Sequence, residues 1–209
     1  MKKYNWHAAA AAALLLCATS SQAQEAASTL RFVATAGLTG GGDTIATAQF
    51  TNGSSENIKS GGLVEFGAGL IWEMPSLPIA VQGTVKYHVD DTSAARNGKI
   101  DFDRVPIEAL VYYTGVKQWR FGAGVRMVTS AEYKARVDGQ PGESVRFKDA
   151  TGLVLETGYA IAPRTWLNVR YVSEKYKPDT YSRGAFTADV SGAEAYSGNH
   201  VGINLLYIF

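Results

Sequence analysis

The residues of this chain that could support acid–base or nucleophilic chemistry are few. His88 and Asp90 are two positions apart, so in a β-strand their imidazole and carboxylate share one face. Ser197 and His200 stand close together before the last hydrophobic segment. A histidine that removes the proton of a serine hydroxyl is typical of hydrolases, provided that the two groups are within hydrogen-bonding reach. The two histidines fall on segments that we expect to lie far apart, so we interpret them as polar residues of a rim or core, without catalysis.

A larger set of charged side chains shares one face of several hydrophobic segments. It consists of Glu65, Lys86, Glu108, Arg120, Arg126, Glu156 and Arg170. The three acids and four bases are nearly balanced, and several glycines on the same face would leave room for the long side chains. Two interpretations fit: a packed network of ion pairs, or a narrow charged pathway for ions.

Composition excludes several classes of function. The chain has 209 residues, with 20 Lys and Arg against 19 Asp and Glu, and this balance argues against a nucleic-acid-binding protein. Its single cysteine excludes a site of several thiolates, and we expect no metal site and no cofactor. The run Gly40-Gly41-Gly42-Asp43 lacks the lysine and helix of a phosphate-binding loop, so we expect a flexible outer loop there.

The first 23 residues have the features of a secretory signal peptide. Lys2 and Lys3 precede an apolar run from residue 8 to 16, and small and polar residues lead to Ala23. We predict cleavage after Ala23, which leaves a barrel domain over residues 24–209. A membrane anchor, or lipoprotein processing at Cys17, is the alternative; the apolar run is short for an anchor, and the residue before Cys17 is not small.

The remaining sequence reads as eight segments of alternating hydrophobicity. Alternation with period 2 predicts strands with one apolar and one polar face. The segments are 30–38, 63–72, 79–90, 104–113, 119–128, 152–161, 167–174 and 200–209. Most are close to the roughly 9–11 residues that a tilted strand needs to cross a membrane. Pro106 cannot donate a backbone hydrogen bond, so we expect a bulge or strand end there.

The connections between these segments alternate in length. Long polar connections are expected over 39–60, 91–99, 131–148 and 178–199, and short ones over 73–77, 115–118 and 162–165. Pro75 and Pro163 suit tight turns. Short turns at one end and long loops at the other are typical of an up-and-down barrel of the outer membrane, with the long loops outside the cell.

A soluble barrel of eight strands would show the same alternation with its apolar face inward. Aromatic side chains near the short-turn end favour the opposite orientation, because a ring of such residues at one level is an interfacial girdle. These residues are Trp72, Tyr113, Trp119, Tyr159 and Tyr207. An interior only wide enough for side chains then favours the packed ion-pair network over the ion pathway.

With these features the chain resembles the small eight-stranded outer-membrane β-barrels, of the OmpA transmembrane-domain and OmpX kind. The resemblance covers about residues 30–209 and is sharpest at the alternating last segment that ends in Tyr207 and Phe209. In that family this end resembles the signal read by the barrel-assembly machinery, so the resemblance implies that partner. No periplasmic domain is expected beyond Phe209.

We therefore expect an all-β, eight-stranded antiparallel transmembrane barrel with a structural or surface-interaction role and no enzyme activity. Its expected partners are outer-membrane lipid, lipopolysaccharide and an unknown ligand of the outer loops. A lipid-modifying hydrolase, such as a lipid A deacylase or phospholipase, is the first alternative. In the barrel hydrolases with Ser and His on one strand the two are two positions apart, whereas Ser197 and His200 are three apart. A narrow ion channel is the second alternative.

Overall fold

The computed structural model describes residues 30–49, 55–92, 98–137 and 139–209. The predicted signal peptide, its cleavage point and Cys17 lie outside the described residues. No described helix is long and apolar enough to cross a membrane.

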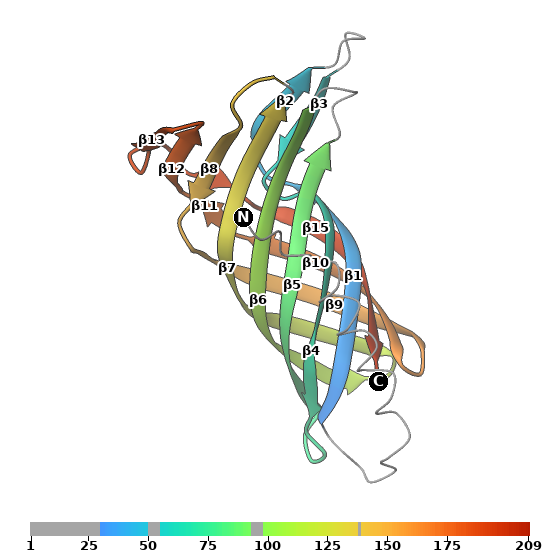
Figure 1. Ribbon diagram of the computed structural model, residues 1–209. Coiled ribbons are helices and arrows are strands. Elements are labelled where there is room, and N and C mark those ends of the chain that lie inside the picture. The colour runs from blue at the N-terminus through green and yellow to red at the C-terminus, as the bar shows by residue number, and fades with distance from the viewer. Residues whose placement is uncertain (1–29, 50–54, 93–97, 138) are drawn as a thin grey trace, which may run out of the picture.

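Eight antiparallel strands form a closed barrel, as the sequence predicted (Figure 1). Each strand pairs with its neighbour in the chain, β7 pairs with β9, and β15 returns to pair with β1. The barrel strands are β1 (Leu30–Gly41), β4 (Leu63–Glu73), β5 (Ile79–Thr92), β6 (Gly98–Val116), β7 (Trp119–Val137), β9 (Ala150–Ala162), β10 (Thr165–Ser173) and β15 (His200–Ile208). Closure satisfies the backbone groups that an open sheet edge would leave unpaired.

The strands place polar and apolar residues on opposite faces, because successive side chains alternate. Along β15 every second residue from His200 to Ile208 is buried, and the residues between them are exposed. The exposed ones are Val201, Ile203, Leu205 and Tyr207. The outside of the barrel is therefore apolar, and the interior holds most of the charged residues of the barrel strands.

Short turns close one end of the barrel. Pro75 lies in the turn between β4 and β5, and Pro163 in the turn between β9 and β10, as predicted. The pairing of β6 with β7 shifts by one residue between Asp103 and Val105, directly before Pro106. The irregularity expected from a proline without an N–H is thus present.

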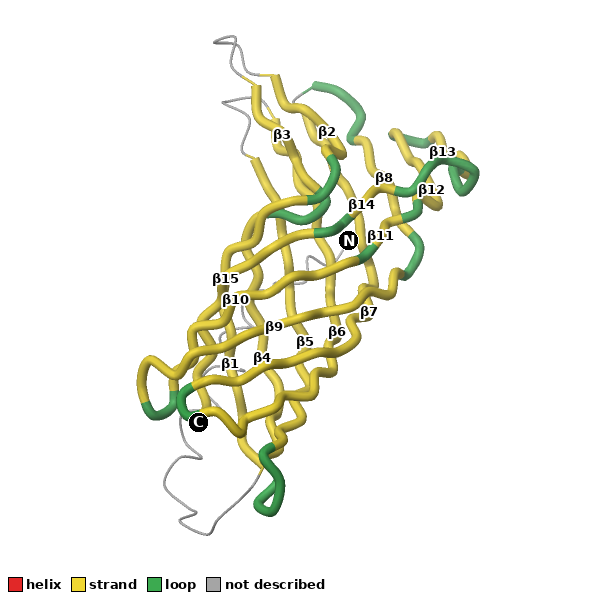
Figure 2. The backbone as a smooth tube through the Cα atoms, turned by 180° about the vertical axis from the view of Figure 1, so that it is seen from behind, coloured by secondary structure: helices red, strands yellow, loops and turns green. Residues whose placement is uncertain are grey.

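At the other end the structure differs from the expectation of long polar loops. The segments expected as loops carry further strands: β2 (Thr44–Gln49), β3 (Ser55–Lys59), β8 (Glu143–Phe147), β12 (Pro178–Arg183), β13 (Phe186–Asp189) and β14 (Tyr196–Ser197). The short strand β11 (Lys175–Tyr176) lies between the seventh predicted segment and the loop expected over 178–199. Strands β8, β12 and β13 continue the sheet sideways from the upper part of β7 (Figure 2). Hydrophobic alternation missed them because most of their residues are polar on both faces.

The expectation of a flexible loop at Gly40-Gly41-Gly42-Asp43 was wrong. Gly40 and Gly41 end β1 and pair with Val201 and His200. The Asp43 amide donates to the Ser197 carbonyl at 2.8 Å, and the Ser197 amide donates to an Asp43 carboxylate oxygen at 2.7 Å. Gly42 has a φ of 76°, a conformation in which glycine is favoured. These bonds hold the end of β1 to the segment that precedes β15.

Candidate functional site

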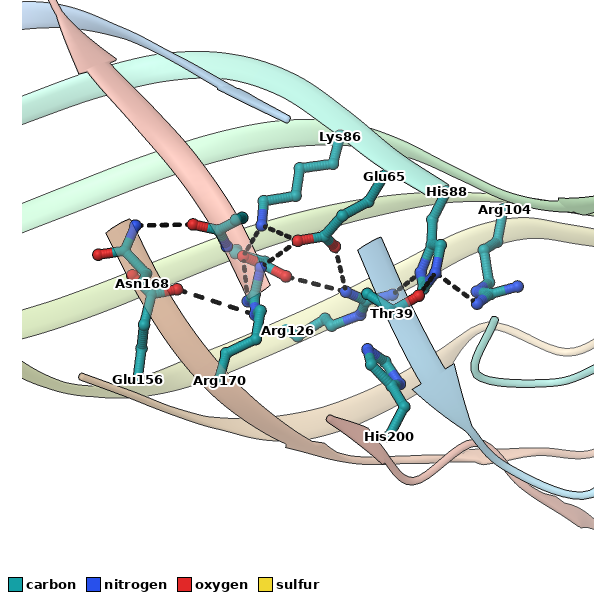
Figure 3. A network of polar contacts seen from close by, with 12 residues as sticks. Thr39, Glu65, Lys86, His88, Arg104, Arg126, Glu156, Asn168, Arg170 and His200 are labelled. Atoms are coloured by element: carbon teal, nitrogen blue, oxygen red, sulfur yellow. Dashed lines mark hydrogen bonds and ion pairs between the residues drawn. The ribbon is translucent and has the colours of Figure 1, made fainter. Parts of the chain in front are cut away.

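The centre of the barrel interior is a network of ion pairs (Figure 3). Arg170 donates to Glu65 at 2.8 Å and to Glu108 at 2.7 Å. The Lys86 ammonium lies 3.0 Å from Glu65 and 3.1 Å from Glu108. Arg126 donates to Glu108 at 2.9 Å. Each of these five side chains is at most 2% exposed, so the two acids and three bases form their ion pairs away from water.

The register of the strands makes room for these long side chains. Inward-facing basic residues stand opposite glycines on the neighbouring strand. The pairs are Lys86 with Gly67, Arg120 with Gly158, Arg126 with Gly152 and Arg170 with Gly202. A Cβ atom at Gly158 would lie 2.8 Å from Arg120 Nε, a distance that real Cβ contacts do not show. Glycine is thus required at Gly158 by the close approach of the guanidinium.

A second layer lies nearer the short turns. Arg120 donates to Asn168 Oδ1 at 2.8 Å and lies 3.3 Å from Glu156. Its guanidinium sits over the rings of Tyr112 and Trp166, at 4.3 and 4.9 Å from their centroids. Below it an apolar cluster fills the interior, with Val33, Ile71, Ala80, Leu110, Leu206 and Ile208 among its members.

The third layer, toward the outer end, brings together residues that were expected to lie apart. The rings of His88 and His200 are 5.3 Å apart in an edge contact. Their strands, β5 and β15, are separated only by β4 and β1 in the closed barrel, and the interior is narrow. The expectation that the histidines lie far apart was wrong because it counted positions along the chain, while closure makes the last strand a neighbour of the first.

The surroundings of His88 do not provide a catalytic triad. Its Nε2 lies 2.7 Å from Thr39 Oγ1, which resembles a hydroxyl–base pair. In a triad the other ring nitrogen donates to a carboxylate that stabilises the imidazolium. Here that atom, Nδ1, lies 3.1 Å from an Arg126 nitrogen, and Nε2 is also 2.9 Å from Arg104. Two guanidinium groups oppose a positive charge on this ring, so it is unsuited to accept a proton from Thr39.

His200 lacks a nucleophile within hydrogen-bonding reach among the described residues. Its Nδ1 donates to the Gly198 carbonyl at 2.7 Å and lies 3.8 Å from Glu174. The Ser197 hydroxyl instead accepts a bond from the Asn199 amide. Ser197 and His200 are near in sequence but form no hydroxyl–imidazole pair.

Several residues of the interior were absent from the predicted network. Glu174 lies 2.9 Å from Arg126 and accepts a hydrogen bond from the Tyr176 hydroxyl. Arg104 donates to the Gly62 carbonyl at 2.8 Å, and its guanidinium lies over the Phe102 ring at 4.8 Å. Asn168 donates to Asn204 at 2.6 Å. Their inward positions in the alternation were the available signal, because they stand on the same face as the predicted charges.

The outer end of the interior is filled by an aromatic cluster. Phe102 contacts Phe147 and Tyr176 edge to face, with centroids 5.4 Å apart in both pairs. Ile58, Val128, Ala131 and Ala150 complete the cluster. The described interior thus contains an apolar layer at one end, charged layers in the middle and aromatic residues at the other. Within the described chain there is no cluster of three or more residues suited to hold a metal ion.

The five aromatic residues predicted as a girdle all lie on the outer face. Trp72, Tyr113, Trp119, Tyr159 and Tyr207 are each between 37% and 51% exposed. Trp119 and Tyr159 pair across β7 and β9 with ring centroids 5.0 Å apart. At the chain end the Phe209 amide donates to the Phe32 carbonyl at 3.0 Å, and the Phe209 ring contacts Tyr207.

Comparisons with known proteins agree with this architecture. The sequence profile of the outer membrane protein beta-barrel domain matches residues 9–209. Neisserial surface protein A has a similar structure, with a TM-score of 0.50 and 11% identity over 88% of this chain and 100% of that chain. No curated protein sequence matches the chain.

Two other solved structures are more distant. The outer membrane protein AlkL in lipid bilayers gives a TM-score of 0.45 and 16% identity, over 91% of this chain and 95% of that chain. The outer membrane protease OmpT of Escherichia coli gives a TM-score of 0.40 and 10% identity, over 91% of this chain and 100% of that chain. At these identities the likeness concerns the fold alone.

Proposed function

The chain belongs to the outer membrane protein β-barrel family, and from this premise we propose that it is a structural barrel of the bacterial outer membrane with a closed interior. The observation that carries the proposal is the central ion-pair network. Glu65, Glu108 and Glu174 pair with Lys86, Arg126 and Arg170 at almost zero exposure, so the three acids balance the three bases. An eight-stranded barrel has an interior just wide enough for side chains, so a filled interior leaves no room for a hydrated ion.

Conductance across a planar lipid bilayer tests the proposal. The purified barrel is expected to give no stable channel openings, and the Arg170→Ala variant to give small or noisy ones because it removes a side chain from the centre. Labelled protein in the same membrane gives an independent count of the inserted barrels, so that an absence of openings is not mistaken for an absence of protein. Regular openings of the unmodified barrel would favour the narrow ion channel.

We propose that the outer strands carry a surface interaction. Strands β8, β12 and β13 form a ledge beside the barrel mouth, and a hollow of about 270 Å³ on it is lined by charged residues that include Glu132, Lys134, Arg136 and Glu143. Replacing residues 178–189 by a short Gly-Ser linker should abolish binding to outer ligands while the barrel still assembles. Binding that survives this replacement would place the interaction elsewhere.

The lipid-modifying hydrolase has less support. His88 faces two guanidinium groups and His200 has no described nucleophile in reach. Mass spectra of lipid A from cells with and without the protein should be the same. A change that disappears in the His200→Gln variant would establish the enzyme.

We also propose that Tyr207 and Phe209 are read by the barrel-assembly machinery and that residues 1–23 direct export. Deleting Phe209 should reduce the folded protein in the outer membrane, while N-terminal sequencing of the exported protein still starts at Gln24. Normal assembly of the chain without Phe209 would contradict the proposed role of Tyr207 and Phe209. An exported protein that starts at a lipidated Cys17 would contradict cleavage after Ala23.

A further inference from the structure

The outer wall of the barrel has an elongated apolar depression across β6, β7, β9 and β10. It consists of two adjoining hollows of about 600 and 490 Å³ that share Val125, Leu153 and Ser173. One row of paired residues crosses it: Ala109 with Val125, Val125 with Leu153, and Leu153 with Ser173. Ala109 and Ser173 stand at the ends of this row, and Ala123 and Thr151 lie in the neighbouring rows. These small side chains leave the depression between larger apolar side chains.

Basic side chains stand at the outer end of this depression. The alternation of exposed and buried residues continues without interruption from Tyr171 to Pro178, so Lys175 and Lys177 face outward on the same side as Tyr171 and Ser173. Lys148 is also exposed, and its amide donates to the Lys177 carbonyl at 2.9 Å. Three exposed lysines therefore lie just beyond the apolar lining.

Acidic groups offset this charge only in part. Lys148 lies 3.8 Å from the Asp179 carboxylate, and Asp149 is exposed next to it. Asp189 also lies near Lys148, so these acids offset Lys148, whereas Lys175 and Lys177 form no ion pair with a described residue.

The β5–β6 side of the barrel differs at the same end, because its charges are paired. Tyr87 is exposed on the outer face, and its hydroxyl donates to Asp103 at 2.9 Å. Lys134 and Lys99 lie 3.1 and 3.5 Å from Asp103 and Asp101. An anionic headgroup would compete there with carboxylates, whereas Lys175 and Lys177 carry no such partner among the described residues.

We propose that the depression binds a phosphorylated, acylated lipid of the outer leaflet, the lipid A part of lipopolysaccharide. The acyl chains would lie along Ala109, Val125, Leu153 and Ser173, and the phosphate groups would meet Lys148, Lys175 and Lys177. Basic residues near a membrane surface attract anionic lipid headgroups, and apolar grooves favour acyl chains. This binding site is independent of whether the interior conducts ions.

Native mass spectrometry of the refolded barrel in detergent tests the site. Diphosphoryl lipid A is titrated against the same lipid with its phosphates removed. The unmodified protein is expected to bind the phosphorylated form more tightly than the dephosphorylated form. The Lys148→Gln/Lys175→Gln/Lys177→Gln variant is expected to lose about 100-fold in affinity for diphosphoryl lipid A, because each basic residue near the surface contributes about 1 kcal/mol. The matched control is Lys59→Gln/Lys99→Gln, which removes exposed lysines elsewhere on the outer part.

A second pair of variants tests the apolar part. Ser173→Phe should fill the depression and weaken binding of both lipids. Ile79→Phe acts in a hollow of about 440 Å³ nearer the short turns, which meets the depression only at Ala123, and should leave binding unchanged. The mobility of each variant before and after heating in SDS shows whether it is folded.

Three outcomes would overturn the proposal. The triple lysine variant could bind diphosphoryl lipid A as tightly as the unmodified protein. Both forms of the lipid could bind equally well to the unmodified protein. Inorganic phosphate at the lipid's own concentration could displace the lipid completely, which would mean a simple anion site without a role for the acyl chains. None of these results would affect the proposal of a closed interior, which conductance tests separately.

Discussion

At the scale of single residues, the interior depends on buried charges that are satisfied by one another and by neighbouring polar groups. Five bases and four acids meet there: Lys86, Arg104, Arg120, Arg126, Arg170, Glu65, Glu108, Glu156 and Glu174. Moving such groups out of water is costly, and the cost is recovered only with close opposite charges and hydrogen bonds. Arg104 donates to the Gly62 carbonyl, and its guanidinium lies over the Phe102 ring, where a cation is favoured.

Removing one partner should therefore cost more than removing an exposed charge. We expect Glu108→Ala or Arg126→Ala to lower the free energy of unfolding by roughly 3–5 kcal/mol, because an opposite charge remains buried without its partner. Arg183→Ala breaks an exposed pair with Glu143 on the outer ledge and should cost less than about 1 kcal/mol. Urea unfolding in lipid vesicles measures both. Equal, small losses for all three variants would mean that water reaches the interior.

The glycines opposite the basic residues allow a second prediction. Gly158→Ala places a methyl group against Arg120 Nε and Asn168 Oδ1, and overpacking of this kind costs about 1–3 kcal/mol. Gly83→Ala is the control, because a Cβ there meets nothing within 4 Å. The same unfolding experiment should show a loss only for Gly158→Ala. A similar loss of unfolding free energy for Gly83→Ala would mean that the effect comes from the strand backbone and not from contacts in the interior.

At the scale of strands, alternation was enough to predict the barrel segments and the face of each residue. The pattern is local, and one buried face specifies the register. It did not predict β2, β3, β8, β12 and β13, because these strands are short and mostly polar, with single buried apolar residues such as Ile58 and Phe147. The interior residues Arg104 and Glu174 showed the right alternation, but alternation contains no distances from which to assign their partners.

The last strand tests which face meets lipid. Leu205 is exposed at the middle of β15, whereas Asn204 is buried and accepts a hydrogen bond from Asn168. Leu205→Arg should cost about 2–4 kcal/mol in a membrane. Asn204→Ser removes one interior hydrogen bond and should cost about 1 kcal/mol. The fraction of heat-shifted protein in membranes compares them, and a full shift for Leu205→Arg with a lost shift for Asn204→Ser would contradict a Leu205 that faces lipid.

The outer part of β6 and β7, beyond the membrane, should respond to pH. Burial raises the pKa of Asp101 above 3.8, and the nearby Asp103 carboxylate adds to the rise, while Lys99 opposes it. A carboxyl group whose pKa is raised in the folded state stabilises that state while protonated, and this contribution is lost as pH rises through the folded pKa. Asp101→Asn should therefore slow amide exchange of the outer part of β6 at pH 7.

This difference should shrink as the pH is lowered, because Asp101, whose pKa is raised above 3.8, then takes up its proton. The control is Asp91→Asn, an exposed aspartate on the adjacent strand. Faster exchange of Asp101→Asn at pH 7 would show instead that its contact with Lys99 outweighs its burial.

At the scale of the whole molecule, closure creates contacts that no local pattern contains. The β1–β15 pairing brings His200 to His88, and Asp43 to Ser197. These contacts were missed because the pattern along the chain specifies which face a residue occupies but not which residues meet across the interior. The closed barrel also separates two environments, an apolar outer wall and a charged interior filled at both ends by apolar side chains.

The most direct test of this account is a scan of spin labels along β15 in lipid vesicles. Single cysteines from Val201 to Tyr207, in a Cys17→Ser background, are labelled and their collision rates with oxygen and with a water-soluble nickel complex are measured. The account predicts high oxygen rates at residues 201, 203, 205 and 207, and low nickel rates at residues 202, 204 and 206. High nickel rates at these inward positions, in barrels shown to be folded, would mean a water-filled interior and would contradict the account.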